Sequence, residues 1–259
     1  MKRRVSWLAL LMLVGGCAVT QSQETPAWQR HEVNPVTGEG YYIYVPSTYR
    51  KESPSPLIIS CHGTPPYDIA EHHIREWKML GERNNCIVVA PTLKATDGIL
   101  GDGPIVGMLA NERQIMTLIS TMGYRYNIDM ANIMITGFSG GGFPTYWLGL
   151  RHPDVFSVIV ARNCNFSASN LSTWWPPEAI TTPVFVYYGE NDAGAIMNQS
   201  QNAIRYLRTN GFNVETAVVP GAGHDRHPEY AMEFFRKHWR TPRPSLPQET
   251  VRPVTAFGK

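Results

Sequence analysis

The sequence predicts an α/β fold: a single domain on a doubly wound, mostly parallel sheet of about eight strands. Short apolar runs rich in β-branched residues alternate with helical stretches over most of the 259 residues. Such alternation is typical of right-handed β-α-β crossovers, which place helices on both faces of a parallel sheet. One sizeable core is expected, since 43% of the residues are hydrophobic and 17% are charged.

The charges argue against one class of function. The 23 Lys and Arg residues nearly balance the 21 Asp and Glu residues, for a formal net charge of +2. A nucleic-acid-binding domain needs a basic face or stripe, whereas the basic run here is Lys2-Arg3-Arg4 near the amino terminus. We therefore expect no nucleic-acid partner.

The first residues resemble a bacterial export signal. The basic Lys2-Arg3-Arg4 precedes the apolar run Val5–Val14, which is too short to span a bilayer and fits a secretory signal. The run continues into Gly15-Gly16-Cys17, which resembles a lipobox whose Cys carries lipid. We expect an exported protein, anchored to a membrane through Cys17. Ordinary cleavage near Ala18, with a periplasmic or secreted product, is the alternative.

These features set the predicted boundaries. Contact with a membrane is expected only through the lipid anchor, because no later stretch is long and apolar enough to span. The segments are a signal peptide over 1–16, a tether over 17–30, a catalytic domain over 31–240 and a Pro-rich tail over 241–259.

The predicted elements follow in chain order. The domain begins with a hairpin signal, in which the turn-rich NPVTGEG precedes a strand over Tyr41–Val45. Apolar runs such as CIVVA predict strands buried on both faces, at 57–60, 86–90, 133–138, 157–161, 184–188 and 214–219. Amphipathic stretches predict helices near 68–83, 109–122, 141–151, 195–210 and 228–239. Ligands of such sheets bind beyond the carboxyl ends of the strands, so the residues after each run are the functional candidates.

The cysteines after Cys17 are expected to be packing residues. Cys61, Cys86 and Cys164 have neither a CxxC pattern nor a zinc-like spacing. We expect them to be small buried hydrophobic side chains.

One strand end carries a G-x-S-x-G motif. Gly137-Phe138-Ser139-Gly140-Gly141 follows an apolar strand and precedes a helical pattern. This context is typical of a nucleophile elbow, a strained turn that lifts the Ser hydroxyl clear of the sheet. Ser139 is therefore the predicted nucleophile.

The segment around this motif resembles a known family. The stretch from Tyr126 through Gly142 is similar to the segment that precedes the catalytic serine of α/β-hydrolases, in particular small secreted esterases of the polyhydroxybutyrate-depolymerase and feruloyl-esterase kind. The likeness covers roughly residues 40–240. It implies an α/β-hydrolase fold, a triad in the order Ser, acid, His, and no metal or organic cofactor.

The resemblance places the other two triad residues downstream. The last predicted strand is followed by Gly221-Ala222-Gly223-His224. In the family the catalytic base follows such a G-x-G after the last strand, so His224 is preferred over His227 as the base. The acid is expected three residues after Gly189, at Asp192, where it orients the imidazole; Glu190 is the competitor.

The resemblance also suggests an oxyanion hole. His62-Gly63 follows the predicted strand over 57–60. In the family a His-Gly at this place opens the oxyanion loop, and the N–H of the residue after the nucleophile, here Gly140, supplies one donor. Pro65 and Pro66 have no N–H, so the second donor is chosen from Gly63, Thr64 and Tyr67, and Thr64 is preferred. His62 is expected to be a structural hydrogen-bonding residue within the loop.

A long segment after the strand at 157–161 contains Trp174 and Trp175. Because loops at strand ends face the substrate in such folds, these side chains are candidates for the acyl-pocket wall. The alternative is that both merely cover core surface.

Together the motifs predict a serine carboxylic-ester hydrolase that forms an acyl-enzyme. Its substrate is expected to be a small-molecule or polymer ester outside the cytoplasm, such as a polysaccharide-linked acyl or feruloyl ester or a polyester. Two alternatives are a prolyl-oligopeptidase-like serine peptidase and a catalytically silent, surface-anchored binding protein. The oligomeric state is not predicted.

Overall fold

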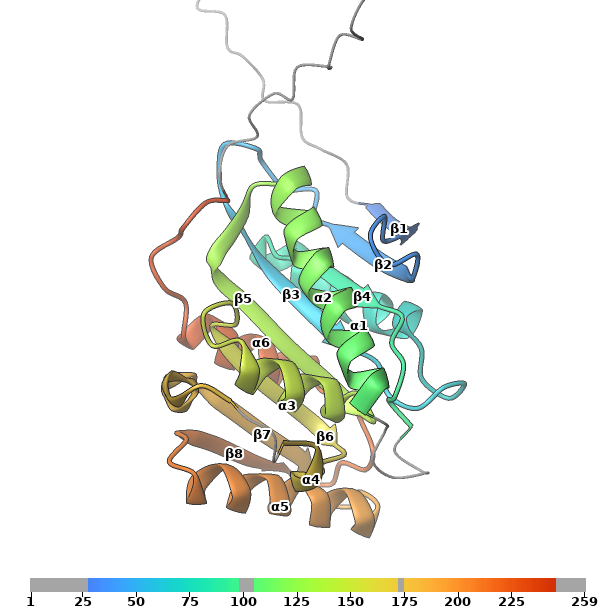
Figure 1. Cartoon of the computed structure of the whole chain (residues 1–259), viewed down its shortest axis with the longest axis vertical. Helices are drawn as coiled ribbons and strands as arrows, with labels where there is room; N and C mark the ends of the chain where they lie inside the picture. The colour runs from blue at the N-terminus through green and yellow to red at the C-terminus, as the bar shows by residue number, and fades with distance from the viewer. Residues whose placement is uncertain (1–27, 98–104, 172–174, 246–259) are drawn as a thin grey trace, which may run out of the picture.

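The computed structural model describes residues 28–97, 105–171 and 175–245 (Figure 1). Within these ranges one sheet contains eight strands. Their bounds are β1 Trp28–Val33, β2 Gly40–Val45, β3 Ser55–Cys61, β4 Ile87–Pro91, β5 Ile128–Ser139, β6 Val158–Cys164, β7 Val184–Gly189 and β8 Val214–Val219. The helices are α1 Ala70–Asn84, α2 Ile105–Arg125, α3 Gly142–Arg151, α4 Ala168–Leu171, α5 Gly194–Thr209 and α6 Pro228–Lys237, with a 3-10 helix η1 over Pro177–Thr181.

The sheet has the order β1-β2-β4-β3-β5-β6-β7-β8. Strand β2 pairs antiparallel with both β1 and β4, and the pairs from β4 through β8 are parallel. The predicted fold class is therefore confirmed. Strand β5 lies between β3 and β6, so the residue that ends β5 lies near the middle of the carboxyl edge.

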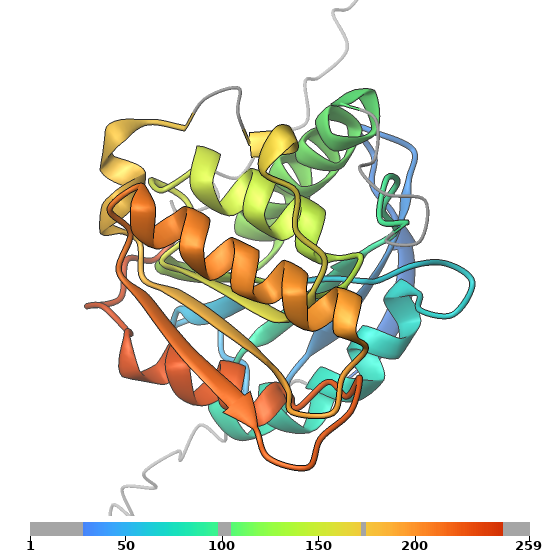
Figure 2. The ribbon, with the colours of Figure 1, turned by 90° about the horizontal axis from the view of Figure 1, so that it is seen from below.

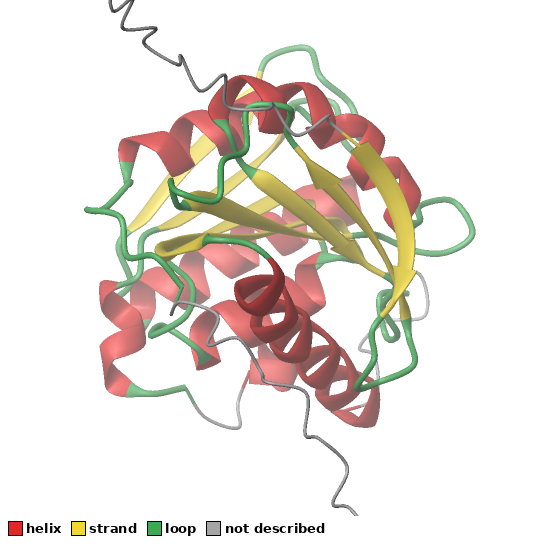
Figure 3. Ribbon diagram, turned by 90° about the horizontal axis from the view of Figure 1, so that it is seen from above, coloured by secondary structure: helices red, strands yellow, loops and turns green. Residues whose placement is uncertain are grey.

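Helices cover both faces of this sheet (Figures 2 and 3). Helices α1 and α6 pack on one face, while α2, α3 and α5 pack on the other. Alternation along β3 explains the two layers, because Leu57 and Ile59 belong to the core under α2 and α3, and Ile58 belongs to the core under α1.

Burial along the strands follows their position in the sheet. All seven residues of β3 are buried, as expected for a central parallel strand covered by helices on both sides. The edge strand β8 is buried at its two ends, Val214 and Val219, and its four middle residues are all partly or largely exposed. A strand at the edge has fewer neighbours, so its outward side chains meet solvent.

Two predicted boundaries need correction. Strand β1 begins at Trp28, so the last three residues of the predicted tether belong to the sheet. The predicted tail also starts with ordered chain, because the N–H of Met130 donates to Arg243 O at 2.7 Å and the N–H of Ser245 to Ile128 O at 2.8 Å. The chain after α6 therefore returns to the start of β5.

The three cysteines of the described chain are free and buried, as predicted. Burial raises the pKa of the Cys61 and Cys164 thiols to about 12 in each case. These side chains therefore stay protonated and pack as apolar groups. No helix in the part of the chain that the structure describes has the length and apolar character needed to cross a membrane.

Candidate active site

Ser139 stands at the turn between β5 and α3. It is the last residue of β5, and α3 begins three residues later at Gly142. Its φ of 53° lies in the left-handed region, which is strained for a residue with a Cβ. Strain of this kind at a strand-to-helix turn is the geometry of a nucleophile elbow.

The glycines of the motif are required by close backbone approach. A Cβ on Gly137 would lie 2.3 Å from Gly141 O, and one on Gly141 would lie 2.2 Å from Cys61 O. Real side chains do not tolerate such contacts. The spacing of the motif thus lets β5 turn into α3 while α3 lies against the end of β3.

His224 and Asp192 form a hydrogen-bonded pair. The Nδ1 of His224 lies 2.9 Å from Asp192 Oδ1 and 3.0 Å from Oδ2. Asp192 follows β7 and its side chain is fully buried, whereas the His224 side chain is 37% exposed in the loop after β8. A buried carboxylate on Nδ1 fixes the ring so that Nε2 is the atom presented to a reacting group.

The pair lies beside the elbow. The ring of His224 packs on the ring of Phe138, with 4.6 Å between their centroids, and Phe138 directly precedes Ser139. The structure therefore brings Ser139, Asp192 and His224 from three separate strand ends into one region.

The two rival residues make other contacts. The carbonyl of His227 accepts the Tyr187 hydroxyl at 2.6 Å, at the start of α6. Glu190 Oε2 accepts the N–H of Gly221 at 2.8 Å and so braces the loop that carries His224. Both residues hold the surrounding loops, and neither occupies the positions of His224 and Asp192.

The loop after β3 approaches the elbow. A Cβ on Gly63 would lie 3.0 Å from Ser139 Cβ, and one on Gly140 would lie 3.1 Å from Thr64 Oγ1. The Thr64 hydroxyl donates to Thr96 O at 3.1 Å. The two residues predicted to supply oxyanion donors, Thr64 and Gly140, thus lie together beside Ser139.

Gly63 and Tyr67 are the other two candidates for the second oxyanion donor. The Gly63 N–H donates to Asp68 Oδ2 at 2.7 Å, so it is already engaged in the loop. The Tyr67 side chain is 77% exposed at the tip of the loop. The Gly63 N–H is thus engaged with Asp68, and Thr64 stays the predicted second donor.

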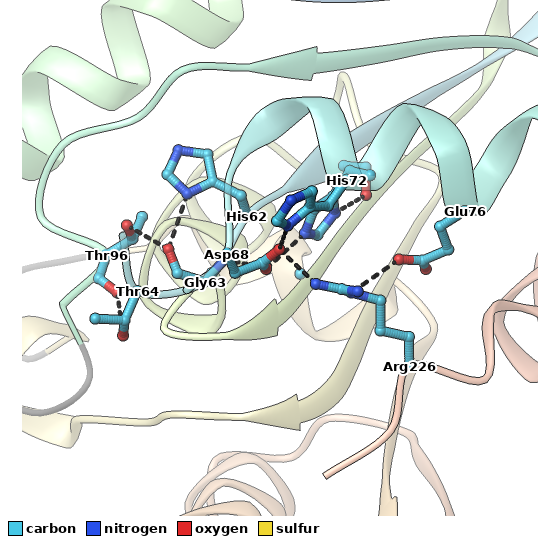
Figure 4. A network of polar contacts seen from close by, with 12 residues as sticks. His62, Gly63, Thr64, Asp68, His72, Glu76, Thr96 and Arg226 are labelled. Carbon is cyan, nitrogen blue, oxygen red and sulfur yellow. Dashed lines mark hydrogen bonds and ion pairs between the residues drawn. The ribbon is translucent and has the colours of Figure 1, made fainter. Parts of the chain in front are cut away.

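His62 holds the loop in place (Figure 4). The N–H of Leu93 donates to His62 Nε2 at 2.9 Å, and Nδ1 lies 2.8 Å from Gly63 O. A neutral ring with its proton on Nδ1 satisfies both contacts. Burial lowers the pKa of His62 to about 4, so the ring is neutral near pH 7 and structural.

A second Ser, His and Asp lie in a row beneath the loop. His73 Nε2 is 2.9 Å from Asp68 Oδ2, and His73 Nδ1 is 2.7 Å from Ser60 Oγ. Both Ser60 and His73 are fully buried, and Trp77 Nε1 donates to Ser60 Oγ at 2.9 Å. No substrate reaches this Ser60, so the row is a structural hydrogen-bond chain.

Sequence reasoning missed Asn163, which links the two loops of the His224–Asp192 pair. Its Nδ2 donates to Asp225 O, and its Oδ1 accepts the N–H of Gly189 at 2.7 Å. Asn163 is the penultimate residue of β6 and has a φ of 48°. Asn tolerates left-handed backbone better than most residues, so Asn at a strand end was the available signal.

The structure describes only the second of the two predicted pocket tryptophans, Trp174 and Trp175. Trp175 packs on Phe212 at a centroid distance of 5.0 Å and adjoins the core. Phe212 comes two residues before the start of β8, so this contact lies at the amino ends of the strands, opposite Ser139. The expectation that Trp175 lines the site is therefore wrong, and its alternative as core covering applies. Trp174 lies outside the described residues, as does Cys17.

Comparison with known proteins identifies related sequences. A family model described as Phospholipase/Carboxylesterase matches residues 107–242 of this chain. A bifunctional acetylxylan esterase/xylanase from Neocallimastix patriciarum is 30% identical over 183 residues, covering 68% of this chain and 23% of that protein. Carboxylesterase SOBER1 from Arabidopsis thaliana is 30% identical over 95 residues, covering 36% of this chain and 41% of that protein. The chain thus spans less than half of either relative.

Solved structures share the fold. A ferulic acid esterase from Anaeromyces mucronatus, in complex with ferulic acid, superposes with a TM-score of 0.61 over 82% of this chain and 89% of that one, at 16% identity. The fluorophosphonate-binding serine hydrolase FphF from Staphylococcus aureus gives a TM-score of 0.61 over 83% of this chain and 99% of that one, at 14% identity. At these identities the likeness establishes the fold alone.

Proposed function

This chain belongs to the phospholipase/carboxylesterase family, and we propose that it is a serine ester hydrolase with Ser139 as its nucleophile. The observation that carries the proposal is the hydrogen bond of 2.9 Å between His224 and Asp192 beside the strained elbow of Ser139. Base, orienting acid and nucleophile in this arrangement are the requirements of acyl transfer through a serine.

Each residue has a stated role in the proposed reaction. His224 Nε2 accepts the Ser139 proton as Oγ attacks the ester carbonyl, and Asp192 stabilises the resulting imidazolium. The N–H groups of Thr64 and Gly140 bind the oxyanion. The alcohol leaves with the proton from His224, and water activated by the same imidazole then hydrolyses the acyl-enzyme.

The proposed substrate is an ester outside the cytoplasm. One relative is named as an acetylxylan esterase, and one solved structure of the same fold contains ferulic acid. Polysaccharide-linked acetyl or feruloyl esters are therefore the first substrates to test, ahead of polyesters and small esters. The basic and apolar residues before Cys17 support export and a lipid anchor. Palmitate labelling of the wild type, compared with Cys17→Ser, tests the anchor.

The function is tested with a substrate panel and one substitution. The panel contains p-nitrophenyl esters from acetyl to palmitoyl, methyl ferulate, acetylated xylan and a dipeptide p-nitroanilide. We expect ester hydrolysis by the wild type and a loss of about 10⁶-fold in kcat for Ser139→Ala.

Two results contradict the proposal. Ester turnover that persists in folded Ser139→Ala removes Ser139 from the mechanism. Cleavage of the anilide without any ester hydrolysis favours a serine peptidase.

A further inference from the structure

The side chain of Arg226 contacts Asp68 in the loop after β3 and Glu76 on α1 (Figure 4). It comes two residues after His224 and donates through one terminal nitrogen to Asp68 Oδ1. Its Nε lies 3.2 Å from Glu76 Oε2, and its guanidinium carbon lies 4.8 Å from the centre of the Phe138 ring. One guanidinium therefore joins the histidine loop, the oxyanion loop and the elbow.

Asp68 transmits this contact to the oxyanion loop. Its other oxygen, Oδ2, accepts the N–H of Gly63 at 2.7 Å, and Gly63 is adjacent to Thr64. Gly63 also lies against Ser139, since a Cβ on Gly63 would be 3.0 Å from Ser139 Cβ. The position of the Asp68 carboxylate thus sets the position of the backbone that carries the proposed Thr64 donor.

The buried Asp68 carboxylate has three basic neighbours, which are Arg226, His73 and His72, whose Nδ1 lies 3.4 Å from Asp68 Oδ1. The side chain of Asp68 is 6% exposed and that of Glu76 is 7% exposed. Burial opposes ionisation of Asp68, but the hydrogen bond and charge of His73, the Gly63 N–H and Arg226 together hold the pKa of its carboxyl well below the usual value. Glu76 has a second partner in the fully buried Arg162. Loss of Arg226 removes a direct cationic partner of Asp68 and leaves Glu76 paired.

We propose that Arg226 is a positioning residue that holds the oxyanion loop and the histidine loop in register across the site, through Asp68. This inference rests on the proposed ester hydrolysis. Arg226 does not touch the reacting atoms, so its effect is confined to where the donors lie when charge develops on the carbonyl oxygen. Interactions realised only in the transition state change kcat and leave KM nearly constant.

The first test replaces the guanidinium by an apolar chain of similar length. We expect Arg226→Met to lower kcat for p-nitrophenyl acetate by about 10 to 10²-fold, the scale of misplaced reacting groups, with KM changed by less than about threefold. Arg75→Met is the matched control, because Arg75 makes an ion pair with Glu71 on the exposed face of α1. The control variant should keep the wild-type kcat.

A second variant covers the case in which Arg226→Met does not fold. Arg226→Lys keeps the positive charge but cannot hold Asp68 and Glu76 with one planar fork. It should keep the wild-type Tm to within a few degrees and still show a lowered kcat. A wild-type kcat in folded Arg226→Lys or Arg226→Met overturns the proposal.

Chemical rescue separates positioning from general damage. The Arg226 side chain is 30% exposed, so guanidinium ion can reach the space left in Arg226→Ala. Added guanidinium at low millimolar concentration should restore part of kcat relative to sodium chloride of equal ionic strength, without raising Tm. A loss that appears in KM, or a lowered kcat that guanidinium leaves unchanged, contradicts the positioning role. Wild-type protein that hydrolyses no ester overturns the proposed function instead.

Discussion

At the scale of single residues, the proposed base and acid differ from their neighbours by their partners. His224 faces a fully buried carboxylate, whereas His227, three residues on, offers its carbonyl to a tyrosine hydroxyl at the start of α6. Glu190 and Asp192 are separated in the same way, because Glu190 braces a backbone N–H of the histidine loop. Chemical type alone does not distinguish these residues, and their contacts do.

This difference predicts unequal effects of substitution. His224→Ala should lower kcat about as much as Ser139→Ala, near 10⁶-fold, because base and nucleophile act as a unit. Asp192→Asn should cost less, about 10⁴-fold, since the imidazole stays but its tautomer is no longer enforced. His227→Ala, the matched control, should keep kcat within about tenfold. The measurement is kcat for p-nitrophenyl acetate, and an essential His227 with a dispensable His224 contradicts the assignment.

At the scale of elements, the crossover from β6 to β7 explains the error at Trp175. Strands β6 and β7 are parallel, so the chain from Cys164 to Val184 must cross the sheet from its carboxyl edge to its amino edge. Trp175 lies in the second half of that crossover and packs on Phe212. A loop that begins at the site need not end there.

We therefore expect Trp175 to contribute to the stability of the fold and not to catalysis. Trp175→Ala should lower the free energy of unfolding by up to about 3 kcal/mol, the lower end of the range for aromatic core truncations, because Trp175 is only partly buried. The values of kcat/KM for acetyl, butyryl and feruloyl esters should all stay near those of the wild type. Trp239→Ala, at a Trp that is 41% exposed, is the control and should cost less. A selective loss for the feruloyl ester would restore the pocket hypothesis.

At the scale of the whole molecule, burial of a neutral imidazole couples folding to pH. His62 has a pKa of about 4 because burial disfavours its charged form. The unfolded chain takes up this proton near the ordinary value of about 6.5. Between these two values the unfolded state binds more protons, so stability rises with pH across this window and is lost as pH falls through it.

The size of this effect is measurable. His62 alone should make the free energy of unfolding fall by up to about 3 kcal/mol between pH 6.5 and pH 4. Urea unfolding at several pH values measures the slope, and His62→Gln, which hydrogen-bonds without titrating, should flatten it. An equal slope in wild type and variant would assign the pH dependence to other groups.

Features that are local in the chain could be predicted from the sequence. The alternation of apolar runs predicted the parallel sheet, and the G-x-S-x-G motif predicted the elbow, because β-α-β periodicity and tight-turn sterics act over a few residues. The resemblance to α/β-hydrolases then suggested Asp192 and His224 at the later strand ends, and the structure brings His224 Nδ1 to 2.9 Å from Asp192 Oδ1.

Contacts between distant segments could not be predicted and are visible only in the folded chain. The Arg226–Asp68 contact joins residues 158 positions apart, and no local pattern marks either side chain as a partner of the other. In the same way, the direction of β7 decides whether Trp175 lies at the amino edge or the carboxyl edge of the sheet. Local sterics and periodicity depend on residues that are close in the sequence. The pairing of buried charges depends instead on which loops the completed sheet places side by side.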